Sequence, residues 1–114
     1  MYNSGKQNEA IEFFNKYLAT INDASEKVNF SFDCFQNIYG SSIEPNHNIF
    51  TVFLNTAKEL EEKYYQKVEY MDKARIYQII SGCYEKLGDE QASKEYKEKA
   101  RQVIQEWTDE SSKN

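Results

Sequence analysis

The residues best suited to binding a metal ion lie in one short segment around the single histidine, His47. Glu44 and His47 form the Glu-x-x-His pattern that carboxylate-bridged di-iron sites use. Such a site needs a second copy of the pattern and further glutamates on facing helices, whereas Pro45 places this copy in a loop. Zinc needs about four ligands, and one histidine with two distant cysteines supplies too few. We therefore expect a solvated loop histidine and no metal or other cofactor.

Nucleophilic catalysis would have to use Cys34 or Cys83, the two cysteines of the chain. A cysteine is activated by a nearby base or cation, and neither has a histidine on its own predicted helix. The four glycines are isolated, so the sequence contains no glycine-rich phosphate loop. Mixed charges between Lys58 and Lys63 are typical of a solvated helix face. The sequence predicts a protein that is not an enzyme, with both cysteines as small packing residues.

The charge balance argues against two classes of partner. Lys and Arg number 14 against 19 for Asp and Glu, which gives a net charge of -5 and opposes attraction to nucleic acid or an anionic bilayer. No CxxC motif, no apolar leader and no apolar run near the ~20 residues of a membrane span is present. We expect a cytoplasmic protein, although removal of a signal peptide would leave the same residues. The chain also begins in the middle of a pattern, which suggests a fragment of a longer protein.

Helical periodicity dominates the whole chain. Apolar residues recur three and four positions apart, and one proline and four glycines leave few helix breakers. The 114 residues are enough for one domain, predicted over residues 1–108, with a polar tail over 109–114. The expected fold class is all-α, with about five helices. Their approximate ranges are 6–21, 23–40, 49–64, 70–86 and 89–107.

Local signals mark the ends of these helices. Asp23 followed by Glu26 has the form of a capping box and predicts the start of the second helix. Gly40 and Gly88 are predicted to end helices, because glycine tolerates the left-handed conformation found there. The segment 41–48 is predicted to be a loop, with its proline in the first turn of the third helix. No glycine or proline marks the end of that helix, which is predicted to fade between residues 64 and 67.

Two segments of the chain follow one repeated pattern. In residues 5–17 and again in residues 88–100, a glycine is followed five positions later by a small residue. In the second copy the small residue is Ser93, and Ala100 closes the pattern. Small residues at such positions let two antiparallel helices approach closely while aromatic residues fill the space beside them.

The helix before the second copy carries matching residues, with Tyr77 at a large aromatic position and Ser81 at a small contact position. Over 74–104, and again over 5–18, the chain resembles the tetratricopeptide repeat family. The resemblance implies a right-handed array of antiparallel helical hairpins, with Ser93 and Ala100 at the contact between the last two helices.

The resemblance also implies a function, because in that family the first helix of each pair lines a concave groove that binds a peptide or protein segment. The positions that this predicts, from the last pair and then from the middle pair, are Arg75, Gln78, Ile79, Gly82, Glu85 and Lys86, with Lys27, Ser31 and Cys34.

Two other functions remain open. The first helix lacks a preceding partner, so the chain could be a homo-oligomerisation or scaffold module, in the simplest case a homodimer. It could also be the sensing part of a peptide-responsive bacterial regulator. Four aromatic residues lie off the main helical stripes and are candidates for binding surface: Phe13, Phe30, Phe50 and Tyr65.

Overall fold

The computed structural model describes residues 4–40 and 47–112, apart from the side chains of residues 4–8, 10, 47, 111 and 112. The predicted helical turn at Pro45 and the predicted exposure of the His47 side chain lie outside the described residues. The described residues form helices and no strand, which confirms the all-α class. The elements are α1 (Ser4–Thr20), α2 (Ala24–Tyr39), α3 (His47–Tyr64), a 3₁₀ turn η1 (Tyr65–Lys67), α4 (Tyr70–Lys86) and α5 (Glu90–Ser112).

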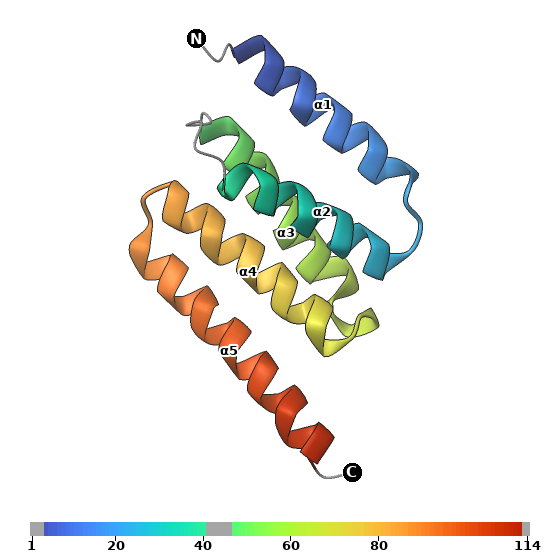
Figure 1. Ribbon diagram of the computed structural model, residues 1–114, viewed down its shortest axis with the longest axis vertical. Coiled ribbons are helices and arrows are strands. Elements are labelled where there is room, and N and C mark those ends of the chain that lie inside the picture. The colour runs from blue at the N-terminus through green and yellow to red at the C-terminus, as the bar shows by residue number, and fades with distance from the viewer. Residues whose placement is uncertain (1–3, 41–46, 113–114) are drawn as a thin grey trace.

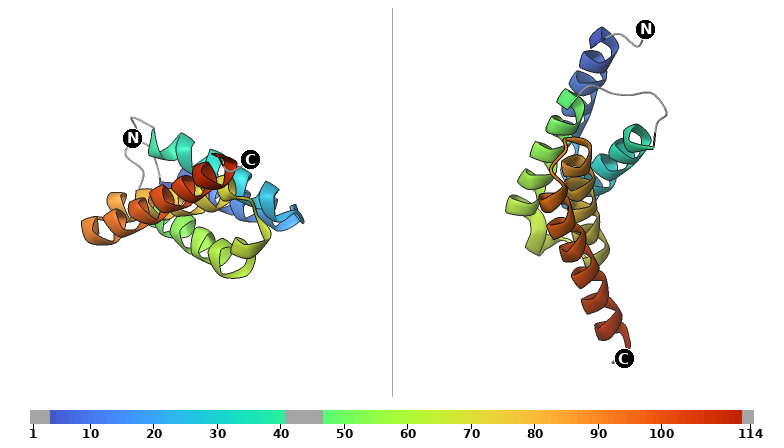
Figure 2. Two further views of the ribbon diagram at one scale, coloured as in Figure 1. Left: turned by 90° about the horizontal axis from the view of Figure 1, so that it is seen from below. Right: turned by 90° about the vertical axis from the view of Figure 1, so that its left-hand side faces the viewer.

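Helix α4 lies at the centre of the molecule. Successive helices run in opposite directions, and α4 contacts α5, α3 and α2 (Figure 1). Seen from the side, α2 and α3 flank α4 on opposite sides (Figure 2). Helix α1 packs mainly against α2 and α3, and less extensively than α4 and α5 pack against each other. The result is an elongated molecule of 53 × 33 × 22 Å.

Helix α4 supplies a large part of the core. On α4, Ile76, Ile80 and Cys83 are completely buried, which agrees with the central place of this helix. Ser93 and Ala100 are buried as predicted, and the Ser93 hydroxyl donates a hydrogen bond of 2.9 Å to the backbone carbonyl of Ser81. Because these residues are small, the backbones of α4 and α5 approach closely along this line.

The predicted helix starts are present. The Asp23 carboxylate accepts a hydrogen bond of 3.0 Å from the amide of Glu26, as expected of an N-cap residue. Asp89 caps α5 in the same way, because its carboxylate accepts a hydrogen bond of 3.1 Å from the amide of Ala92. Gly88 has φ 90°, in the left-handed region, and its neighbour Asp89 donates its amide to the carbonyl of Tyr84 at 2.8 Å. Gly88 therefore ends α4 for the predicted reason.

Other helix ends differ from the expectation. Gly40 follows α2 with φ -84° and is right-handed, so its lack of a side chain is not required by the backbone there. Helix α3 begins at His47, inside the predicted loop 41–48. Helix α5 continues to Ser112 through the predicted polar tail, because that segment contains no helix breaker and the Tyr70 hydroxyl donates a hydrogen bond of 2.6 Å to Glu110. The predicted end of α3 is confirmed, since η1 follows Tyr64.

Candidate binding face between α2 and α4

The residues predicted from the last helical pair divide into two groups. Gln78, Glu85 and Lys86 are exposed on α4, and Arg75 is half-buried beside them. Ile79 is completely buried, and Gly82 is buried as well. A groove along α4 would therefore present the first group to a ligand, whereas Ile79 and Gly82 belong to the interior.

Gly82 is buried because α2 crosses α4 there. A Cβ atom built on Gly82 would overlap the tip of the Phe35 ring and would lie 3.2 Å from each of its two Cε atoms. Phe35 is itself in the core, so its ring has little room to move. The small residue at position 82 allows this close approach of the two helices.

The residues predicted from the middle pair have different surroundings. The Lys27 ammonium group donates a hydrogen bond of 3.1 Å to the backbone carbonyl of Leu18, at the end of α1. Ser31 is completely buried. Cys34 lines a cavity between α1, α2 and α3. Lys27 and Cys34 therefore lie toward α1, whereas Ser31 lies in the interior.

Asn29, Phe32 and Tyr39 of α2 contact charged side chains of α4. They were absent from the prediction, although their spacing of three and seven positions is that of one helix face. Together with Arg75, Gln78, Glu85 and Lys86 of α4, they form what we call the α2–α4 face.

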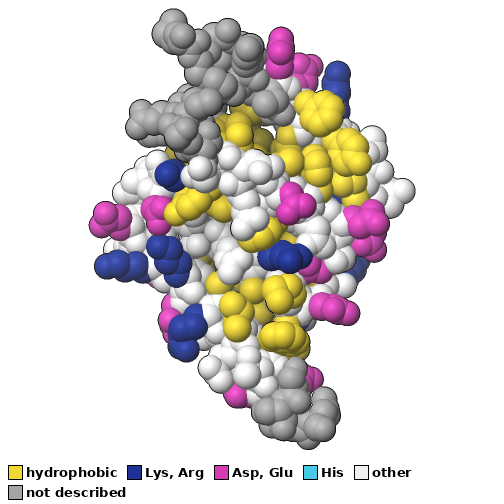
Figure 3. Space-filling model, viewed as in Figure 1, with side chains coloured by type: hydrophobic (Ala, Val, Ile, Leu, Met, Phe, Trp, Pro, Cys, Tyr) yellow, Lys and Arg dark blue, Asp and Glu magenta, His cyan; other side chains and the backbone are white. Residues whose placement is uncertain are grey.

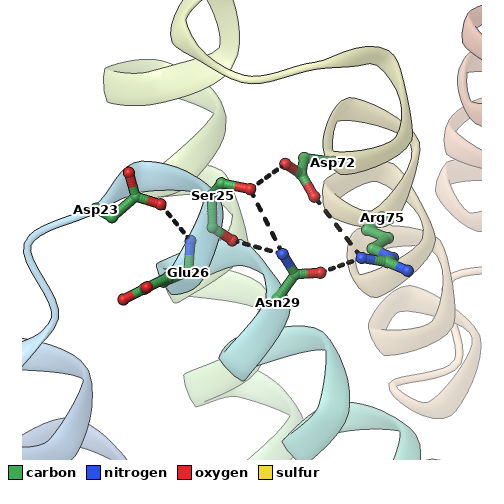
Figure 4. A network of polar contacts seen from close by, with 6 residues as sticks. All are labelled: Asp23, Ser25, Glu26, Asn29, Asp72 and Arg75. Atoms are coloured by element: carbon green, nitrogen blue, oxygen red, sulfur yellow. Dashed lines mark hydrogen bonds and ion pairs between the residues drawn. The ribbon is translucent and has the colours of Figure 1, made fainter.

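A polar network joins the beginnings of α2 and α4 at one end of this face (Figure 4). The Ser25 hydroxyl donates a hydrogen bond of 2.5 Å to the carboxylate of Asp72, which is only 6% exposed. The same carboxylate lies 3.7 Å from Nη1 of Arg75. Asn29 accepts a hydrogen bond from that nitrogen, and its amide nitrogen donates to the backbone carbonyl of Ser25 at 2.9 Å. Each member thus has a defined partner.

The network fixes the orientation of Arg75. Its guanidinium group lies 5.4 Å from the centre of the Phe32 ring, so an aromatic surface supports it as well. Among the described contacts, only Nη1 is engaged by protein groups, and the other end of the guanidinium points away from the network (Figure 4). The Arg75 side chain is 33% exposed, so its remaining donors are accessible to another molecule.

A second polar cluster lies at the other end of the face. The Tyr39 hydroxyl donates a hydrogen bond to Glu85, and Lys97 of α5 donates to the same carboxylate at 3.1 Å. These two bonds lower the pKa of Glu85, because they favour its charged form. The bond to Glu85 also raises the pKa of Tyr39. The ammonium group of Lys86 lies 4.8 Å from the centre of the Tyr39 ring.

The two thiols lie in environments that favour the protonated form. Burial raises the pKa of Cys83 to about 12. Burial, and then the negative charge of Asp33, raise the pKa of Cys34. Because the thiolate is the nucleophilic form, neither environment activates the sulfur.

The potential metal ligands lie apart from one another in the part of the chain that the structure describes. Within that part of the chain, no three His, Cys, Asp or Glu side chains form a group that could hold a metal ion. No described helix has the length and apolar character needed to cross a membrane.

Hydrophobic side chains are exposed at both ends of the molecule (Figure 3). On α1, Phe13 is 67% exposed and Tyr17 is 49% exposed, and their rings stack with centroids 6.2 Å apart. At the other end, Met71, Ile104 and Trp107 are exposed. Among the four aromatic residues that lie off the main helical stripes, Phe13 is exposed, Phe30 and Tyr65 are half-buried, and Phe50 is buried. Phe50 is therefore not available as binding surface.

Comparisons with protein-family models, curated proteins and solved structures give no match for this chain.

Proposed function

We propose that this chain is a binding module that holds an extended segment of another protein, or a peptide, on the α2–α4 face. The observation that carries the proposal is the way in which the guanidinium group of Arg75 is held. Asn29, Asp72 and Phe32 hold its guanidinium group in place, while part of that group remains accessible. A donor held in its bound orientation loses little conformational entropy when a ligand binds, so it contributes more to affinity than a free surface arginine would.

The length of the face suits a short segment. Arg75 and Lys86 lie eleven positions apart on α4, which corresponds to roughly 16 Å along a helix that rises about 1.5 Å per residue. An extended peptide covers this distance with about five residues. In the proposal, Arg75 binds a carbonyl or carboxylate oxygen of the segment, and Gln78 offers a neutral hydrogen-bonding group beside it. The resemblance to tetratricopeptide repeats supports the same face, and no catalytic step is part of the proposal.

The experiment is a selection of peptides from a displayed random library against the purified chain, followed by titration of the selected peptides. Binding to Arg75→Lys and Gln78→Ala variants is compared with binding to the parent chain. Lysine keeps the positive charge near Asp72 but lacks the planar fork of donors, so it tests the geometry of the arginine. Lys94→Ala is the matched control, because Lys94 is an exposed cation on α5 outside the face.

We expect each of the two face variants to weaken binding by about tenfold, the effect of losing a charge-assisted or well-oriented hydrogen bond. The control should bind as the parent does. Peptides that bind all four proteins equally would show that the α2–α4 face is not the binding surface.

Self-association is a second candidate function, which the exposed Phe13 and Tyr17 on α1 favour. Adjacent exposed aromatic residues are common where a helix packs against another chain. Light scattering over a range of concentrations measures this directly. A dimer mass that the double variant Phe13→Ser, Tyr17→Ser abolishes would support the candidate, and a monomer mass at every concentration would exclude it.

A further inference from the structure

A cavity of about 280 Å³ lies where α1 meets α2 and α3. Phe13 and Phe14 of α1 form one wall. Cys34 and Asn37 of α2 form a second wall, and Val52 of α3 contributes to the third. Phe13 and Asn37 are exposed to solvent, so the cavity lies at the edge of the core and a ligand could enter it without unfolding of the chain.

The chemistry of the walls is almost entirely apolar. None of the described residues that line the cavity carries a charged side chain, and Asn37 supplies the one amide among them. The raised pKa of Cys34 keeps its thiol neutral, so this wall is uncharged at neutral pH as well. An apolar cavity favours apolar atoms over water, because a water molecule there lacks hydrogen-bonding partners.

The volume limits what the cavity accepts. It approaches the lower end of the range of small-molecule sites, about 300 Å³, and exceeds the roughly 150 Å³ in which an engineered apolar cavity binds benzene. A helix of about 10 Å diameter needs far more space. The α2–α4 face uses other residues of α2, so the cavity is separate from the proposed peptide site.

From this geometry we infer that the cavity between α1, α2 and α3 is a binding site for a small uncharged molecule, a single aromatic ring with a short alkyl chain and one hydrogen-bonding group. The ring and the alkyl chain contact the phenylalanines and Val52, and the polar group meets the amide of Asn37. A carboxylate or an ammonium group is excluded, because the described walls provide no opposite charge and its desolvation would not be compensated.

A molecule in this cavity would also affect how firmly α1 is held. This helix packs less extensively against the rest of the molecule than the other helices do, and Phe14 contacts the rings of Phe30 and Phe53 at centroid distances of 5.4 and 5.0 Å. A molecule in the cavity would touch α1 and its two neighbours at once. Binding would therefore hold α1 more firmly against α2 and α3.

The test uses 4-ethylphenol as the probe and isothermal titration calorimetry as the measurement. For a ligand of this size we expect a Kd on the order of 1 mM or below. Two variants reduce the cavity from different walls, Val52→Phe and Cys34→Leu, and circular dichroism checks that each remains helical. Ile104→Phe is the matched control, because it enlarges an exposed apolar residue on α5, away from the cavity.

We expect either cavity variant that remains folded to bind 4-ethylphenol at least about fivefold more weakly, and the control to bind within about twofold of the parent. A further measurement needs no variant: the probe should slow the alkylation of Cys34 by iodoacetamide at pH 8, because Cys34 lines the site. The anion of 4-ethylbenzoic acid should neither bind nor protect Cys34. No binding of 4-ethylphenol, equal binding to the filled variants, or equal binding of the anion would overturn the inference.

Discussion

The replacement Gly82→Ala tests the contact that brings α2 against α4. On an exposed helix surface this change stabilises a protein by about 1 kcal/mol, because alanine is the better helix former. Here the added methyl group would overlap the tip of the Phe35 ring, and both residues are buried. Overpacking of a filled core typically costs about 1 to 3 kcal/mol. The two effects have opposite signs, and we expect a net loss of about 1 kcal/mol, the middle of the range that they allow.

A second replacement separates the two effects. Phe35→Leu removes the ring tip that the new methyl group would meet, and by itself should cost about 1 to 2 kcal/mol through the loss of buried apolar area. In the double variant the overlap is gone, so the helix-forming preference of alanine should reappear. We therefore expect the double variant to be more stable than the sum of the single effects by at least about 1 kcal/mol.

Urea unfolding followed by circular dichroism gives the free energy of unfolding of the parent, the two single variants and the double variant. The comparison requires that this free energy has the same slope against urea concentration in all four proteins. Gln78→Ala is a useful control, because it places alanine at an exposed position of the same helix. Additive effects within about 0.5 kcal/mol, or a Gly82→Ala variant more stable than the parent, would refute the close approach of α2 and α4 at this point.

Three further predictions concern buried polar groups. Ser31→Ala should stabilise the protein by up to about 1 kcal/mol in urea unfolding, because the buried hydroxyl of Ser31 has no hydrogen-bond partner among the residues that the structure describes. A loss of stability would contradict this. Arg75→Ala should lower the free energy of unfolding by about 1 to 3 kcal/mol, because it leaves the buried carboxylate of Asp72 without its cation. The double variant Arg75→Ala, Asp72→Asn should recover part of this loss. If it recovers none, the two side chains do not form a stabilising pair. In the folded state, burial raises the pKa of the Cys83 thiol from its ordinary value of 9.0 to about 12. The unfolded chain therefore releases this proton first, and the free energy of unfolding should fall as the pH rises above about 9. Between pH 8 and 10.5, the urea midpoint should fall less for Cys83→Ala than for the parent chain. Identical pH dependence in the two proteins would be evidence against this role of Cys83.

The helices themselves could be predicted from the sequence because the information for them is local. The spacing of the apolar residues, the caps at Asp23 and Asp89 and the left-handed Gly88 each act within a few positions of the chain. The small residues Ser81, Ser93 and Ala100 also predicted correctly where α4 and α5 meet, since these helices are joined by a tight turn that leaves few alternative pairings.

Local rules were less informative where two outcomes have similar energies. The segment after Trp107 is polar and makes few contacts, but it contains no residue that breaks a helix, and α5 continues through it. Phe50 lies off the main stripe of α3 and was a candidate for binding surface. It is buried because α3 is covered on more than one side.

The candidate site was only partly predictable, because it depends on contacts between residues far apart in the chain. The sequence by itself determined that α4 is an amphipathic helix. The resemblance to tetratricopeptide repeats placed Arg75, Gln78, Glu85 and Lys86 in a groove along it, together with Ile79 and Gly82, which are buried. Only the tertiary structure decided which side of α2 meets α4. The contact that orients Arg75 joins residues 46 positions apart, and the one that ties Ser25 to Asp72 joins residues 47 apart. Helical periodicity states which residues share a face but not how that face is rotated toward a distant helix, which is decided by the fit of Phe35 against Gly82.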